Sequence, residues 1–122
     1  MFTGVVDMGK YYDGIVKNEY TKGLRFGKNL KHLRKMYNLN ISQLADLSWT
    51  TPVRIKRYEA EESLPILYTV LKISQYFKIP IDDLCFSKLT RWDVLRDAQR
   101  RYFELAAYRG IEVPDDIPGG SG

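Results

Sequence analysis

Two helix-start signals, at positions 40 and 51, constrain the fold more than any other feature of the chain. Asn40 and Gln43 have the spacing of a capping box, in which each side chain satisfies a free backbone N–H at the start of a helix. Thr51 is a good N-cap, and Pro52 at the first helical position loses no hydrogen bond. The two signals predict a short helix over 41–48, a tight turn, and a further helix directly after Thr51.

Apolar residues at helical spacing predict one helix before this pair and two after it. The stripe of the first helix is Phe26, Leu30, Leu33 and Tyr37. Pro65 begins a later helix that runs to about residue 77, and the inner stripe expected for it is Leu67, Val70, Leu71, Ser74 and Phe77. A short fifth helix follows, with Asp82 and Asp83 in its first turn, where carboxylates favour the positive end of the helix dipole. Its expected core residues are Ile81, Leu84 and Cys85.

The segments on either side of these helices differ in character. Residues 88–109 are highly charged and carry Trp92, Leu95, Tyr102 and Leu105 at roughly helical spacing, which predicts one long amphipathic helix. Its apolar stripe either folds back on the core or pairs with another copy, and these four residues are the candidate dimerisation contacts. Residues 1–22 form an N-terminal extension with a weakly marked helix, and residues 110–122 are expected to be a flexible tail.

Positive charge is concentrated in the middle of the chain. Between residues 21 and 65 nine cations face four anions, a net charge of +5, whereas the overall net charge is +4. Such a stretch favours a polyanionic partner, although a solvated helical face explains the charge equally well. A single cysteine and the lack of a signal peptide indicate a reducing cytoplasm, and no apolar run is long enough to span a membrane.

Catalysis is poorly supported by the residue pattern. The only histidine, His32, falls in the middle of a helix beside a lysine, where a solvent-facing role outweighs that of a general base. Cys85 has no second cysteine near it and fits a buried core thiol. No metal-ligand spacing and no glycine-rich phosphate loop is present, so no metal site, no cofactor and no enzymatic activity are expected.

Residues 24–86 resemble the Xre-type helix-turn-helix family, which includes Cro and phage repressors. The matching stretches are LKHLRK, SQLADLS, IKRYE and LPILYTVLKISQYFKIPIDDL. The resemblance implies an all-α fold, in which a five-helix helix-turn-helix domain at 23–87 is followed by the extra C-terminal helix and preceded by the helix suggested within 1–22. It also implies that the third helix of the domain enters the major groove of DNA.

The resemblance assigns roles to individual positions. The set implied to meet bases or phosphates is Thr51, Pro52, Val53, Arg54, Lys56 and Arg57. Arg57 is suited to donate two hydrogen bonds to guanine O6 and N7, and Lys56 is suited to phosphate. Pro52 and Val53 offer either apolar contact or simple helix-start packing. Arg34 and Glu59 match positions that form an ion pair between the first and third helices, a structural support.

Three positions depart from the family pattern. Ile41 replaces a common glutamine at the start of the second helix, Trp49 stands where glycine is usual, and Ala60-Glu61-Glu62 replaces an Asn-Gly turn. Carboxylates near phosphates are repulsive. These departures favour an alternative in which the domain is a protein-interaction module, either an adaptor or an antitoxin-like protein, that reads DNA weakly or not at all.

The balance of the sequence favours a regulator that binds double-stranded DNA sequence-specifically, with repression as the expected outcome. Helix-turn-helix regulators bind as dimers to half-sites about one helical turn apart. A homodimer is therefore expected, with 88–109 as its first candidate contact, and a protein partner remains the alternative. No membrane association is expected.

Overall fold

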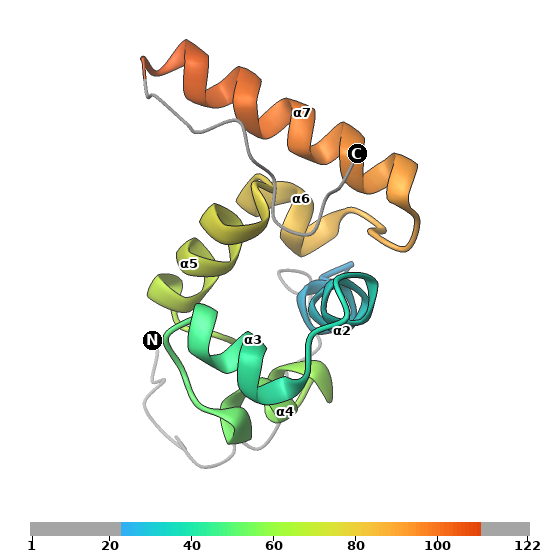
Figure 1. Cartoon of the computed structure of the whole chain (residues 1–122), viewed down its shortest axis with the longest axis vertical. Coiled ribbons are helices and arrows are strands. Elements are labelled where there is room, and N and C mark those ends of the chain that lie inside the picture. The colour runs from blue at the N-terminus through green and yellow to red at the C-terminus, as the bar shows by residue number, and fades with distance from the viewer. Residues whose placement is uncertain (1–22, 111–122) are drawn as a thin grey trace, which may run out of the picture.

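The computed structural model describes residues 23–110, and these residues contain helices but no strand, which confirms the all-α prediction. The helices run in the order α2 (Phe26–Met36), α3 (Ile41–Leu47), α4 (Pro52–Glu59), α5 (Leu67–Phe77), α6 (Ile81–Phe86) and α7 (Trp92–Tyr108). In Figure 1, α4 lies at the end of the molecule opposite α7. The helix suggested within 1–22 and most of the expected tail lie outside the described residues.

Local capping explains where the central helices begin. The Asn40 side chain accepts from the backbone N–H of Gln43, and the Gln43 side chain accepts from that of Asn40, both at 2.8 Å, so the predicted capping box is present. Thr51 caps α4, and Pro52 occupies its first turn. At the other end of α5, Lys78 adopts a left-handed conformation with φ of 59° and terminates the helix.

One core lies between the helices and extends into α7. Its fully buried side chains include Leu30 and Leu33 of α2, Leu44 of α3, Ile55 of α4, Ile73 and Phe77 of α5, Leu84 of α6 and Leu95 of α7. Each of these side chains contributes about 1.5–3 kcal/mol by leaving water. Of the three residues expected to complete the core from α6, Leu84 is fully buried, whereas Ile81 and Cys85 are half-buried against it.

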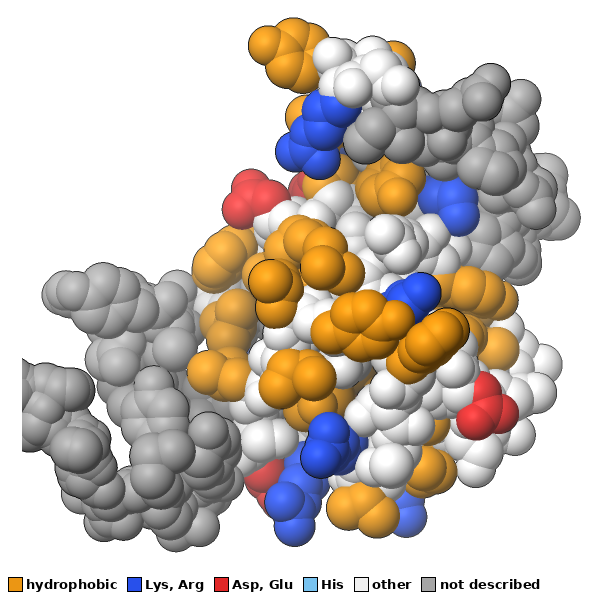
Figure 2. Space-filling view, turned by 90° about the vertical axis from the view of Figure 1, so that its left-hand side faces the viewer, with side chains coloured by type: hydrophobic (Ala, Val, Ile, Leu, Met, Phe, Trp, Pro, Cys, Tyr) orange, Lys and Arg blue, Asp and Glu red, His pale blue; other side chains and the backbone are white. Residues whose placement is uncertain are grey.

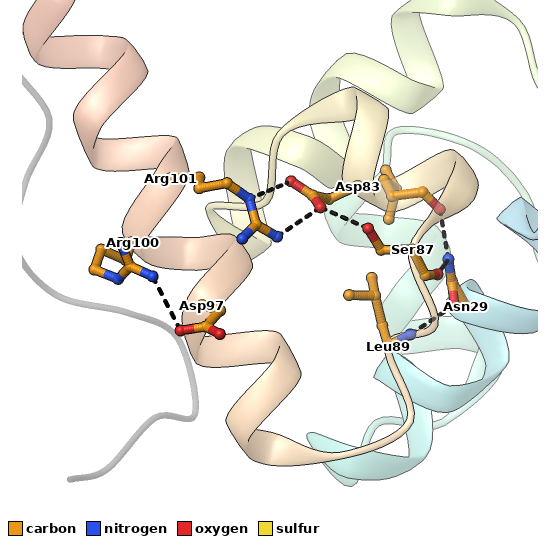
Figure 3. Close-up of polar contacts among 8 residues, drawn as sticks. Asn29, Asp83, Ser87, Leu89, Asp97, Arg100 and Arg101 are labelled. Carbon is orange, nitrogen blue, oxygen red and sulfur yellow. Dashed lines mark hydrogen bonds and ion pairs between the residues drawn. The ribbon is translucent and has the colours of Figure 1, made fainter.

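Asn29, a buried residue of α2, fixes the chain after α6. Its side-chain N–H groups donate to the carbonyls of Leu84 at 2.8 Å and Ser87 at 2.7 Å, and its side-chain oxygen accepts from the N–H of Leu89 at 3.2 Å (Figure 3). All the hydrogen-bonding groups of the amide are used except one lone pair of its oxygen. A buried amide with these partners holds the α6–α7 connection in one position.

Helix α7 folds back on the core through side chains in its first half and its middle. Gln99 donates to the phenol oxygen of Tyr37 and to the carbonyl of Phe77, both at 2.9 Å. Arg101 donates to both carboxylate oxygens of Asp83 at 2.7 and 3.1 Å, which ties α7 to α6 (Figure 3). Asp83 therefore holds two helices together, in addition to its expected place at the positive end of α6.

The expected inner stripe of α5 is partly wrong. Val70, Ser74 and Phe77 are buried as predicted, but Leu67 is 67% exposed and Leu71 is 37% exposed, and Ile73 takes the central core position. The helix begins at Leu67 rather than Pro65. Apolar residues occupy more than one face of α5, and the packing of α5 against α3 and α6 decides which face is covered.

Candidate nucleic-acid interface

Helix α4 has one buried and one exposed side. Ile55 is fully buried and Tyr58 is 4% exposed, because these residues, three apart, share the face that packs on α2 and α3. Every residue expected to meet DNA lies on the opposite side and is exposed: Thr51, Pro52, Val53, Arg54, Lys56 and Arg57. The fold therefore brings the candidate contact residues together on one continuous helical surface.

The cations of this surface are available to an anion. Arg54, Lys56 and Arg57 form no ion pair or side-chain hydrogen bond with any part of the chain between 23 and 110. Thr51 is partly committed, since its hydroxyl oxygen accepts from the backbone N–H of Arg54 at 3.3 Å. Exposed guanidinium and ammonium groups without protein partners are suited to phosphates and to the acceptor edge of guanine.

Glycine at position 27 lets α2 approach α4 closely. A Cβ atom built on Gly27 would lie 2.2 Å from the carbonyl oxygen of Tyr58, far inside any allowed contact. Only glycine fits where two backbones meet in this way. The only sign of this role in the sequence is a glycine inside a predicted helix, a signal too weak to predict the close approach.

An ion pair joins α4 to α2. The Arg34 guanidinium donates to both carboxylate oxygens of Glu59, at 2.7 and 3.0 Å, and one of its nitrogens also donates to the carbonyl of Leu39 at 3.4 Å. The Arg34 side chain is 16% exposed and that of Glu59 is 8% exposed. The hydrogen bond with Glu59 is the main cause of a raised pKa at Arg34. The pair implied by the resemblance is thus present, and it holds the carboxylate of α4 on the side away from the exposed cations.

The segment after α4 carries two glutamates, and they are arranged differently. Glu61 has a φ of 61° and its carboxylate lies 3.9 Å from the Lys28 ammonium, which offsets part of its charge. Glu62 is exposed. At the start of α3, Ile41 is half-buried and packs against the core, so this position contributes apolar packing.

The turn between α3 and α4 is tight and unusual in composition. Trp49 has a φ of 58°, a region that favours glycine, and its side chain is 67% exposed. The next backbone N–H, that of Thr50, donates to the carbonyl of Ala45 at 3.0 Å and closes the turn. The ring of Trp49 meets Tyr68 of α5 edge-on with 5.9 Å between centroids.

The four candidate dimerisation residues of α7 divide between core and surface. Leu95 is fully buried in its own chain and is therefore unavailable to a second copy. Trp92 packs beside Tyr37, with 5.4 Å between ring centroids, and under the Arg96 guanidinium. Tyr102 and Leu105 line a groove of about 380 Å³ between α5, the start of α6 and the C-terminal half of α7.

The residues considered for catalysis lie apart from this surface. His32 is half-buried within α2, and Cys85 is half-buried in α6. Burial and the nearby Asp82 raise the pKa of the Cys85 thiol, which opposes the thiolate form that a nucleophile requires. Within residues 23–110, no group of three or more histidine, cysteine, aspartate or glutamate side chains is placed to hold a metal ion.

Comparison with known proteins identifies the central part of the chain. A family model described as helix-turn-helix matches residues 30–84. This segment is a helix-turn-helix domain of the Xre type. The matched segment begins within α2 and ends within α6, and it contains all of α3, α4 and α5.

The helix-turn-helix domain also matches a curated protein. That relative is the cryptic phage CTXphi transcriptional repressor RstR of Vibrio cholerae, 32% identical over 62 residues. The match covers 51% of this chain, and the chain spans about half the length of the relative, 55%. No solved structure matches the chain. No helix between residues 23 and 110 has the length and apolar character needed to cross a membrane.

Proposed function

We propose that the chain is a transcriptional regulator, acting as a repressor, that binds double-stranded DNA sequence-specifically through α4. The observation that carries the proposal is the exposed face of α4, where Arg54, Lys56 and Arg57 have no partner within residues 23–110 while Glu59 is held behind by Arg34. The match to a phage transcriptional repressor supports the regulatory role.

Each part of this face has a distinct task in the proposal. Arg57 donates to guanine O6 and N7 in the major groove, a contact that discriminates by about 1–3 kcal/mol. Lys56 meets phosphate and supplies affinity without sequence information. Pro52 and Val53 at the start of α4 have no side-chain donors, so their contribution is apolar, such as contact with a thymine methyl group.

Selection from a randomised duplex pool tests the proposal. The full chain is compared with a Lys56→Ala/Arg57→Ala variant and with a control, Lys31→Ala/Lys35→Ala, which removes the same charge from exposed positions on α2. We expect enrichment of a two-fold symmetric sequence by the wild type and by the control, and loss of that enrichment in the α4 variant. Equal enrichment by all three proteins, or by none, would refute the proposal.

A second candidate function is a protein-interaction module that does not read DNA. The exposed Trp49 in the turn before α4 and the exposed Glu62 after it favour this candidate, because neither side chain suits a surface against phosphates. In the same selection, this candidate predicts no enriched sequence and weak binding that is unchanged by the α4 substitutions.

A further inference from the structure

An exposed apolar surface lies on α5 and the turn before α4. We call it the α5 face, and it consists of Trp49, Leu64, Ile66, Leu67, Tyr68 and Leu71, which are 37–67% exposed. Figure 2 shows the side of the molecule where α5 lies, and hydrophobic side chains gather over the middle of this face. Residues 63–71 form a run without a single charged residue. Solvent-exposed helices ordinarily carry charged residues on their outer side.

The α5 face is large enough for a protein contact. At roughly 200 Å² for a large side chain, its six residues expose on the order of 600 Å². Isolated monomers rarely carry an apolar patch beyond about 300–600 Å². A standard interface buries about 800 Å² on each partner, so the face supplies most of the apolar centre that such an interface needs.

Trp49 adds an independent sign of function. A left-handed backbone costs a non-glycine residue about 1–2 kcal/mol, and exposure leaves much of this large side chain in water. Its ring is nevertheless held in place, edge-on to Tyr68 and under the Lys72 ammonium at 4.4 Å from its centroid. Exposed, ordered tryptophan and tyrosine are typical anchors of protein interfaces.

We infer that the α5 face is the contact between two copies of this chain. The choice of partner rests on the proposed function, because helix-turn-helix proteins use two reading helices spaced one turn of DNA apart, about 34 Å. Trp49 lies two residues before the N-cap of α4, so the face adjoins the start of that helix. A two-fold axis through the α5 face therefore keeps both α4 helices near the axis.

The position of α7 explains why the expected dimer contact there is less suitable. In Figure 1, α7 and α4 lie at opposite ends of the molecule. A contact through the end of α7 therefore places the two α4 helices on the outer sides of the dimer, far from each other. The α5 face is uncharged, so two copies of it can pair without a partner surface of opposite charge. Homodimer interfaces are also more apolar than those of transient complexes.

Sedimentation equilibrium of the full chain between roughly 1 and 100 µM tests the inference over the Kd range in which such a dimer forms. The test variant is Ile66→Glu/Leu67→Glu, at side chains that are 57% and 67% exposed. The control is Tyr108→Glu at the end of α7, 89% exposed. We expect a wild-type dimer, a dimer Kd weakened at least about 30-fold in the test variant, and a change below about 3-fold in the control.

A second variant protects the test against misfolding. Ile66→Lys alone changes the N-cap residue of α5 and leaves the helix itself intact, and circular dichroism verifies that it is folded. It is expected to weaken the dimer as well. A wild-type monomer throughout, a test variant that stays dimeric, or a control that dissociates equally would overturn the inference. Because this measurement contains no DNA, a dimer that selects no DNA sequence refutes only the proposed function, and a monomer that selects one refutes only the α5 contact.

Discussion

At the scale of single residues, Gly27 stands where any side chain would collide with the backbone of α4. Alanine is intrinsically better than glycine in a helix by about 1 kcal/mol. Its Cβ at position 27 would nevertheless overlap the backbone oxygen of Tyr58, which cannot move without displacing α4. We expect Gly27→Ala to lower the free energy of unfolding by about 1–3 kcal/mol. Urea denaturation measures this, with Lys35→Ala on the exposed side of α2 as a near-neutral control, and a stabilised Gly27→Ala protein would contradict the close approach.

The Arg34–Glu59 pair is the other residue-scale feature on which α4 depends. Removing Arg34 leaves a carboxylate that is 8% exposed without its partner, and breaking a buried pair in this way costs about 3–5 kcal/mol. We expect Arg34→Ala to lose stability on that order in urea denaturation. The double variant Arg34→Met/Glu59→Leu restores most of it, because neither charge is then left buried. A loss below about 1 kcal/mol in the single variant would show that the pair is dispensable.

At the scale of helices, α7 has two halves with different roles. Leu95 in the first half fills the core, whereas Leu105 in the second half is 43% exposed. We expect Leu95→Ala to cost about 2–5 kcal/mol and Leu105→Ala far less. The cost of Leu95→Ala should be the same at every protein concentration, because the contact lies within one chain. Thermal unfolding at several concentrations measures this, and a cost that grows with protein concentration would place Leu95 at a dimer interface instead.

The link between α6 and α7 is sensitive to pH through Asp83. Desolvation raises the pKa of this carboxyl, but hydrogen bonds from Arg101 and Ser87 outweigh it and hold the pKa below its usual value. A lowered pKa in the folded state stabilises the fold above the unfolded pKa of about 4, and that stability is lost as the pH falls through the folded value.

The matching variant is Asp83→Asn. We expect it to reduce stability at pH 7 by about 1 kcal/mol, since the Arg101 side chain is 43% exposed. The difference from the wild type should shrink as the pH is lowered below about 4. Urea denaturation from pH 7 to pH 3 measures it, and a difference that is constant across this range would contradict the ion pair.

In the same helices, some features were predictable from the local sequence and others were not. The starts of α3 and α4 were predictable, because the capping box and the Thr51-Pro52 pair act within one turn of the residues they cap. The outward side of α5 was not predictable, because apolar residues lie on more than one side of that helix. Only the packing of the neighbouring helices decides which side is covered. The contact between Arg101 and Asp83 spans 18 residues and depends on the direction of α7, which no local pattern encodes.

At the scale of the whole molecule, the exposed side of α4 was predictable from the sequence. That this side binds DNA is a proposal. Once Ile55 faces the core, helical geometry places Lys56 and Arg57 outside, and the structure has them exposed. The proposed dimer contact was not predictable in the same way. The sequence left Leu95 open between the core and a second copy, and it is buried; Leu67 was expected in the core, and it is exposed. An apolar stripe predicts that a helix is covered without identifying what covers it.

The salt dependence of affinity for the selected DNA duplex tests the central claim most directly. Each phosphate contact contributes about −0.9 to the slope of log affinity against log salt, because bound counterions are released. We expect a steep wild-type slope, a slope shallower by about 1 for Lys56→Ala, and an unchanged slope for the Lys35→Ala control. A wild-type slope near zero, or the same slope in Lys56→Ala as in the wild type, would contradict the account in which α4 binds DNA.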